Sequence, residues 1–156
     1  MDSIRNRLQI GVIGGRSAEP HVLAWAEDAG RGIARRHAVL VCGGMGGVME
    51  AACRGAKMEG GSTVGILPGT ALDKANQYVD YAVATGMGFA RNAVIIQSVS
   101  GVIAIGGRYG TLSEIGFALQ KGIPVVSLSS WDLGKDILQA KSPDQAVDML
   151  FNLLKV

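Results

Sequence analysis

Residues 101–114, GVIAIGGRYGTLSE, contain the pattern that decides the fold. The first five residues form a short apolar run rich in β-branched side chains, which is typical of a buried strand. The glycine pair Gly106-Gly107 ends this run, and apolar residues at helical spacing follow over 111–121. A strand, a glycine turn and a helix in this order form the repeating unit of an α/β protein.

The same unit recurs on both sides of this stretch. Apolar runs predict strands over 8–13, 38–42, 63–67, 78–84, 101–105 and 124–128. Helical spacing predicts helices over 20–36, 48–58, 88–99 and 111–121, and a last helix from Ser142 or Asp144 to Leu154. Short Val/Ile/Leu runs that alternate with helices indicate a doubly wound parallel sheet covered on both faces. We therefore expect one Rossmann-like α/β domain over residues 1–156.

The composition limits the class of protein. Of the 156 residues, 48% are apolar and 18% are charged, which excludes a disordered chain. The 15 basic and 13 acidic residues leave a formal charge of +2, too balanced for binding along a nucleic acid polymer. No apolar run approaches the ~20 residues that cross a membrane, and residues 1–7 lack the apolar core of a signal peptide. Cys42 and Cys53 indicate neither a disulfide framework nor a metal cluster, so we expect a cytoplasmic location.

Glycine is the unusual component. The chain has 23 glycines, roughly twice the usual share. The pairs Gly14-Gly15, Gly43-Gly44 and Gly106-Gly107 each end a predicted strand. Ligands of such sheets bind beyond the carboxyl ends of the strands, and the exposed N–H groups at a helix start attract anions. We therefore predict two converging anion-binding loops, 43–47 and 106–111, although any single pair also suits a plain tight turn.

The predicted ligand contacts come from these loops and from three arginines. Arg91 begins a predicted helix, where its charge opposes the helix dipole, so we expect an anionic partner for it. Arg16 and Arg108 lie within the glycine loops. The full set of predicted phosphate-binding residues is Gly14, Gly15, Arg16, Ser17, Gly43, Gly44, Met45, Gly46, Gly47, Arg91, Gly106, Gly107, Arg108, Gly110 and Thr111.

Glu114 has two interpretations. Its spacing from Thr111 matches a capping box, in which each side chain bonds a backbone N–H of the helix start. A carboxylate beside a bound sugar phosphate would instead stabilise an oxocarbenium-like state or activate water. No G-x-G-x-x-G follows the first predicted strand and no G-x-x-x-x-G-K-[ST] occurs, which disfavours an ordinary NAD domain and a Walker-type NTPase. No zinc-binding motif is present, and we expect no metal.

Three stretches resemble a known superfamily: GGMGGVMEAACRGA (43–56), GMGFARN (86–92) and GGRYGTLSE (106–114). The chain resembles the LONELY GUY-like Rossmann superfamily, often mislabelled as lysine decarboxylases. Within it, the sequence looks most like the small molybdenum cofactor carrier proteins. The resemblance implies the Rossmann-like fold, phosphate binding and a homo-oligomer, which we expect to be a dimer or tetramer.

The phosphoribohydrolase branch of that superfamily carries the motif P-G-G-x-G-T-x-x-E. Here Ile105 stands in place of the proline, and Arg108-Tyr109 puts two residues where the branch has one. By resemblance, the catalytic glutamate and arginine would be Glu114 and Arg91, but the lysine that usually follows this arginine is Asn92.

These departures favour a protein that binds a phosphate-bearing small ligand, either an AMP-like nucleotide or the molybdenum cofactor, and needs no cofactor of its own. Hydrolysis of the N-glycosidic bond of a nucleoside monophosphate is the alternative. A third hypothesis is an interaction module in which residues 94–96 build a contact between copies of the chain. It does not explain the glycine clusters.

Overall fold

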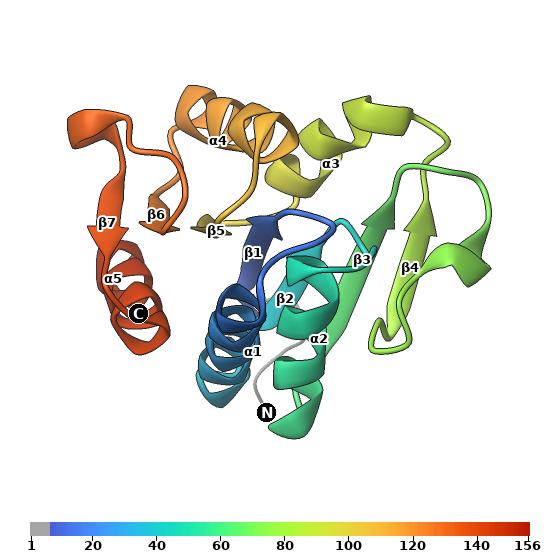
Figure 1. Cartoon of the computed structure of the whole chain (residues 1–156), viewed down its shortest axis with the longest axis horizontal. Coiled ribbons are helices and arrows are strands. Elements are labelled where there is room, and N and C mark those ends of the chain that lie inside the picture. Colours follow the sequence, from blue (N-terminus) through green and yellow to red (C-terminus); the bar gives the residue numbers. More distant parts are fainter. Residues whose placement is uncertain (1–6) are drawn as a thin grey trace.

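The computed structural model describes residues 7–156, which form one seven-stranded parallel sheet with helices on both faces (Figure 1). Residues 1–6 of the domain expected over 1–156 lie outside the described residues. The expectation that residues 1–7 contain no signal peptide therefore falls almost wholly outside them too. The sheet order is β4-β3-β2-β1-β5-β6-β7. The strands are β1 Gln9–Gly14, β2 Val39–Cys42, β3 Thr63–Leu67, β4 Tyr81–Ala84, β5 Gly101–Ile105, β6 Val125–Leu128 and β7 Leu138–Ala140.

The helices divide between the two faces of the sheet. They are α1 Pro20–Arg35, α2 Val48–Met58, α3 Arg91–Gln97, α4 Tyr109–Lys121 and α5 Pro143–Leu154, with short 3-10 turns η2 Leu72–Lys74, η3 Gly88–Ala90 and η4 Gly134–Asp136. One core lies under α1, α2 and α5, and a second lies under α3 and α4 (Figure 1). No helix of residues 7–156 is long and apolar enough to cross a membrane.

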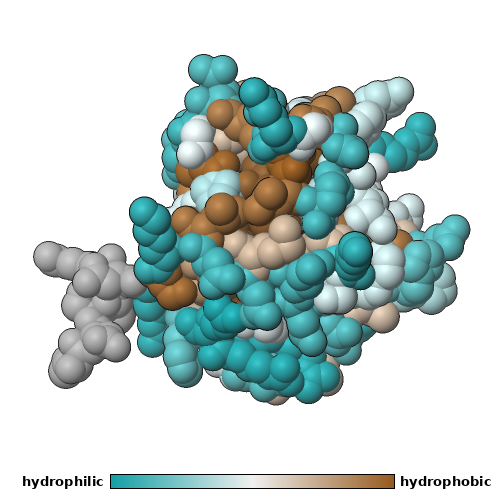
Figure 2. Space-filling view, turned by 90° about the vertical axis from the view of Figure 1, so that its left-hand side faces the viewer, coloured by the Kyte–Doolittle hydropathy of each residue, from teal (hydrophilic) through white to brown (hydrophobic). Residues whose placement is uncertain are grey.

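The predicted doubly wound parallel sheet is confirmed, with local differences. β7 was missed because its three residues are not an apolar run and its first two side chains are exposed. It lies at the sheet edge on the face shown in Figure 2, where exposed apolar side chains gather and where Leu138 and Leu153 are 41% and 45% exposed. β4 begins at Tyr81 instead of residue 78 because the residues before it turn around Thr63, whose side chain donates to the Tyr78 carbonyl.

The strand order reverses between β1 and β5, and this reversal positions the site. Gly14, the last residue of β1, pairs with Ile105, the last residue of β5. Crossover connections leave this point in opposite directions along the sheet, to β2 on one side and to β6 on the other. A crevice therefore opens beyond the carboxyl ends of these two strands, where ligands bind in doubly wound sheets.

Close contact between α1 and α2 depends on helical glycines. A Cβ at Gly30 would lie 2.0 Å from the Ala52 carbonyl oxygen, and one at Gly55 would lie 1.9 Å from the Glu27 carbonyl oxygen. The two helices therefore approach each other backbone to backbone. Cys53 of α2 and Cys42 at the end of β2 are buried free thiols whose Sγ atoms lie 3.5 Å apart.

We expect Gly55→Ala to lower the free energy of unfolding by about 1–3 kcal/mol, because the added methyl forces α1 and α2 apart. Gly116→Ala is the matched control. Gly116 also lies within a helix, but a Cβ there meets nothing within 4 Å, so the change should be neutral or stabilise by up to ~1 kcal/mol. Urea unfolding of both variants measures the difference, and equal stabilities would contradict the packing argument.

Candidate functional site

A cavity of about 390 Å³ lies beyond the carboxyl ends of β1 and β5, at the reversal of strand order. Among the residues predicted from the sequence, those lining it are Gly14, Gly15, Arg16, Ser17, Arg91, Gly107, Arg108, Gly110, Thr111 and Glu114. Five other residues that line the cavity were not predicted from the sequence: Met49, Pro68, Gly88, Phe89 and Asn92. The loop after β1, the start of α3 and the start of α4 therefore meet around one space.

A larger cavity of about 840 Å³ lies at the opposite edge of the sheet, before the strands begin. Its Arg35 is paired with Glu59 at 2.8 Å, and its Arg36 is paired with Asp148. Because these charges already have partners, and because doubly wound sheets bind ligands at the other edge, we place the site at the smaller cavity.

The start of α4 faces the smaller cavity with unused hydrogen-bond donors. Gly106 and Gly107 have φ values of +56° and +87°, a left-handed conformation that favours glycine. This turn brings the chain into helix at Tyr109, and no side chain caps the helix start at Arg108. The first N–H groups of a helix have no partner within it, so those of α4 are available to an anion in the cavity.

The capping-box interpretation of Thr111 and Glu114 is wrong. α4 begins two residues before Thr111, so Thr111 is the third residue of the helix and not its cap. Thr111 and Glu114 are 4% and 6% exposed, and both line the cavity. The three-residue spacing therefore puts both side chains on the helix face that borders the cavity.

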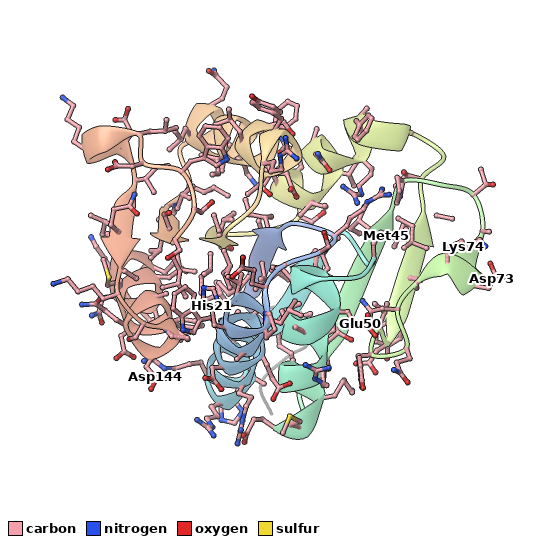
Figure 3. The ribbon with its side chains drawn as sticks, in the orientation of Figure 1. His21, Met45, Glu50, Asp73, Lys74 and Asp144 are labelled. Atoms are coloured by element: carbon pink, nitrogen blue, oxygen red, sulfur yellow. The ribbon has the colours of Figure 1, made fainter. Side chains whose placement is uncertain are left out.

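The 43–47 loop, predicted to hold phosphate, lies behind the cavity wall. A Cβ at Gly43 would lie 2.6 Å from Arg91 Nη2, and one at Gly47 would lie 2.3 Å from the Gly15 carbonyl oxygen. Met45 lies near the end of β3 in Figure 3, where its carbonyl accepts a 2.9 Å hydrogen bond from Asn76 Nδ2. Gly43, Gly44, Met45, Gly46 and Gly47 do not line the cavity, and neither does Gly106. The glycines of the 43–47 loop let the chain pack closely beneath the residues that line the cavity.

Arg91 is a buried charge with an unused donor. The side chain is 7% exposed, Nη1 donates to Asn92 Oδ1, and Nη2 donates to the Gly43 carbonyl at 3.5 Å. Nε has no hydrogen-bond partner among residues 7–156. Burial lowers the pKa of the Arg91 guanidinium, and the negative charge of Glu114 opposes that shift. A buried donor without an acceptor is rare in folded proteins, so Nε needs an acceptor from outside the described residues, either a water or a ligand.

Glu114 lies near Arg91 without forming an ion pair in the described part of the chain. Burial raises the pKa of the Glu114 carboxyl from about 4.5 to about 8, although the positive charge of Arg91 acts in the opposite direction. Most of this carboxyl is therefore protonated at neutral pH. In that form it adds a hydrogen-bond donor to the cavity and leaves the charge of Arg91 uncompensated.

A chain of hydrogen bonds fixes Arg91 relative to the start of α4. Asn92, the acceptor of the Arg91 bond, donates from Nδ2 to Ser113 Oγ at 3.1 Å. Ser113 Oγ then donates to the Gly110 carbonyl at 2.6 Å, within the first turn of α4. The guanidinium and the helix start are thus held in one arrangement. Residues 7–156 contain no group of three or more His, Cys, Asp or Glu side chains that could hold a metal ion.

A doubly wound parallel sheet with a cavity at its reversal point defines a Rossmann-like α/β protein. More specifically, the sequence model of the SLOG cluster4 family matches residues 7–153, and the chain belongs to this family. An uncharacterized protein of Archaeoglobus fulgidus is 42% identical over 141 residues, which cover 90% of this chain and 93% of that protein.

Two solved structures are similar over nearly the whole chain. The molybdenum cofactor binding protein of Rippkaea orientalis superposes with a TM-score of 0.91 at 36% identity, covering 97% of this chain and 99% of that chain. The molybdenum cofactor carrier protein of Chlamydomonas reinhardtii gives 0.87 at 30% identity, covering 96% of this chain and all of that chain (100%). The resemblance to the carrier proteins is therefore confirmed.

The raised pKa of Glu114 predicts a pH-dependent loss of stability. In the folded protein the Glu114 carboxyl keeps its proton up to about pH 8, whereas in the unfolded chain it releases the proton above pH ~4.5. The free energy of unfolding therefore falls as pH rises from about 4.5 to about 8. The slope is at most ~1.4 kcal/mol per pH unit. Glu114→Gln has no such proton to lose and should gain stability relative to the parent protein across this range.

Urea unfolding at pH 5 and pH 8 measures this effect. Asp73→Asn is the control, because Asp73 is exposed in the turn η2 and forms no ion pair within the described residues. If the parent protein and Glu114→Gln lose stability in parallel between the two pH values, Glu114 is ionised in the native state and the assignment is wrong.

Proposed function

We propose that this protein binds a phosphate-bearing small ligand of the molybdenum cofactor type in the cavity beyond β1 and β5. One observation carries the proposal: Arg91, a buried cation whose Nε has no hydrogen-bond partner among residues 7–156, and the uncapped start of α4 border the same space. Both are strong donors to an anion, one through a charged side chain and the other through backbone N–H groups and the helix dipole.

The phosphate would lie at the first turn of α4. The N–H groups of Tyr109, Gly110 and Thr111 would donate to its oxygens, and Arg91 would pair with its charge. Gly110 allows close approach because it has no side chain, and a Cβ there would meet no protein atom within 4 Å. Arg16 and Arg108 line the same cavity and add positive charge at its edge.

The similarity to two proteins described as binding or carrying the molybdenum cofactor supports a ligand of this kind. The pterin of that cofactor and the base of an AMP-like nucleotide are both planar rings joined to a phosphate, so the same cavity suits either. The cytoplasmic location, the dimeric or tetrameric state and the preference for a small ligand over a nucleic acid polymer stay predictions.

Hydrolysis of a nucleoside monophosphate is the second candidate function. It is favoured by the Glu114 carboxyl, which lines the cavity beside Arg91 and whose pKa of about 8 lies close to a physiological working pH. A group with such a pKa suits acid–base catalysis. In this reaction Glu114 would act at the ribose, and Arg91 would orient the phosphate.

Arg91→Met tests the proposed binding. We expect the affinity for AMP, measured by calorimetry, to fall about 10- to 100-fold, because a hydrogen bond to a charged group contributes roughly 1.5–3 kcal/mol. Lys135→Met, in the exposed turn η4, is the control and should bind as the parent protein does. Unchanged affinity in Arg91→Met would reject this arrangement of the site.

Release of free adenine from AMP, followed by chromatography, tests the second function. If the protein is a hydrolase, Glu114→Gln should still bind AMP but lose at least ~100-fold in turnover, since a positioned acid or base contributes about that much. Binding without any adenine release by the parent protein at saturating AMP would reject hydrolysis and leave the binding function.

A further inference from the structure

One side of the cavity is apolar and is not used by the proposed phosphate contacts. The apolar lining residues are Phe89 in η3, Met49 on α2 and Pro68 after β3. Phe89 is 85% exposed, the largest exposed fraction of any large hydrophobic side chain in residues 7–156. Burial of a phenylalanine side chain is worth about 1.5–3 kcal/mol, so a ring left in water at the edge of a cavity is a ready contact for an apolar group.

Backbone hydrogen bonds hold Phe89 at this edge. The Gly88 N–H donates to the Pro68 carbonyl at 2.9 Å, and the Gly86 N–H donates to the Gly69 carbonyl at 2.8 Å. Gly86 and Gly88 have φ values of +64° and +60°, a left-handed backbone that turns the chain at the start of η3. Phe89 is therefore attached to the carboxyl end of β3 through a fixed turn, two residues before Arg91.

Phe89 also has no aromatic partner within the described residues. The aromatic pairs there are His21 with Trp25 and Tyr109 with Trp131. The second pair lies at the start of α4, where Trp131 Nε1 donates to the Arg108 carbonyl at 3.0 Å. The ring of Tyr109 therefore has an aromatic neighbour, although it is 73% exposed, whereas the ring of Phe89 has none among residues 7–156.

We propose that Phe89 is the stacking surface for the planar, fused heteroaromatic ring of the ligand whose phosphate lies at the start of α4. The inference rests on the proposed function and adds a second point of recognition to it. An aromatic side chain stacks on the face of such a ring and does not read the hydrogen-bonding groups at its edge. Phe89 would therefore accept a purine or a pterin. The phosphate end would anchor the ligand, and Phe89 would select ligands that carry a ring.

Ligands with and without a ring separate the two contributions. Calorimetry should compare guanosine 5′-monophosphate and neopterin phosphate, which carry a ring, with ribose 5-phosphate, which does not. We expect Phe89→Ala to weaken binding of the ring-bearing ligands about 5- to 150-fold, the equivalent of a stacking contribution of roughly 1–3 kcal/mol. Ribose 5-phosphate should bind both proteins within about twofold.

Two further variants make the comparison specific. Phe89→Tyr keeps the ring face and should restore affinity for the ring-bearing ligands. Phe117→Ala is the matched control, because Phe117 is a partly exposed phenylalanine on α4 that does not line the cavity. A loss for both ring-bearing ligands supports the stacking role, and a larger loss for one of them shows which ring Phe89 prefers.

An equal effect of Phe89→Ala on all three ligands, or no effect on any, would overturn the stacking role and leave the phosphate site intact. If Phe89→Ala alters the oligomeric state in light scattering while ligand affinity is unchanged, Phe89 contacts a second copy of the chain and the inference is wrong. Failure of the parent protein to bind any of the three ligands would reject the proposed function itself, and this inference with it.

Discussion

The site depends on the buried guanidinium of Arg91. A charge in the interior is costly unless it is hydrogen-bonded, and the surrounding structure is arranged to hold this one. Gly43 has no side chain where Nη2 approaches, Asn92 accepts from Nη1, and Ser113 links Asn92 to the first turn of α4. The remaining Nε has no acceptor among residues 7–156, so the hydrogen bonding of this guanidinium is incomplete, and Arg91 is one of the residues that line the cavity.

The separation between Arg91 and Glu114 gives the cavity its charge. Had the two groups formed an ion pair, each would have neutralised the other. Instead, burial dominates at Glu114 and raises its pKa to about 8. At neutral pH the cavity therefore contains a buried cation and a mostly neutral acid, with Arg16 and Arg108 also in its walls. This combination favours an anion over a cation or a neutral ligand.

The sequence predicted the sheet and the cavity because both follow from local patterns, but it could not identify the contacts of each residue. Gly43 and Gly47 correctly indicated close approach, yet the approaching group is Arg91 in one case and the Gly15–Arg16 backbone in the other. The T-x-x-E spacing suggested that α4 begins at Thr111. It begins at Tyr109 instead, because the left-handed turn at Gly106-Gly107 starts the helix two residues earlier, and the spacing does not reveal this turn. Asn92 was noted only as a departure from a family pattern, since its partner Ser113 is 21 residues away along the chain.

The glycines fall into classes that bear on function. Gly14, Gly30, Gly47 and Gly55 are required by packing, because a Cβ at each would lie within 2.5 Å of a backbone oxygen. Gly88 and Gly107 are required by their left-handed backbone. Gly110 meets neither requirement: it lies in the first turn of α4, its backbone is not left-handed, and it has open space around it. Gly116 in the same helix also has open space, but only Gly110 of the two lines the cavity. A glycine that packing does not require, placed at the helix start and in the cavity wall, fits the close approach of the ligand that we propose.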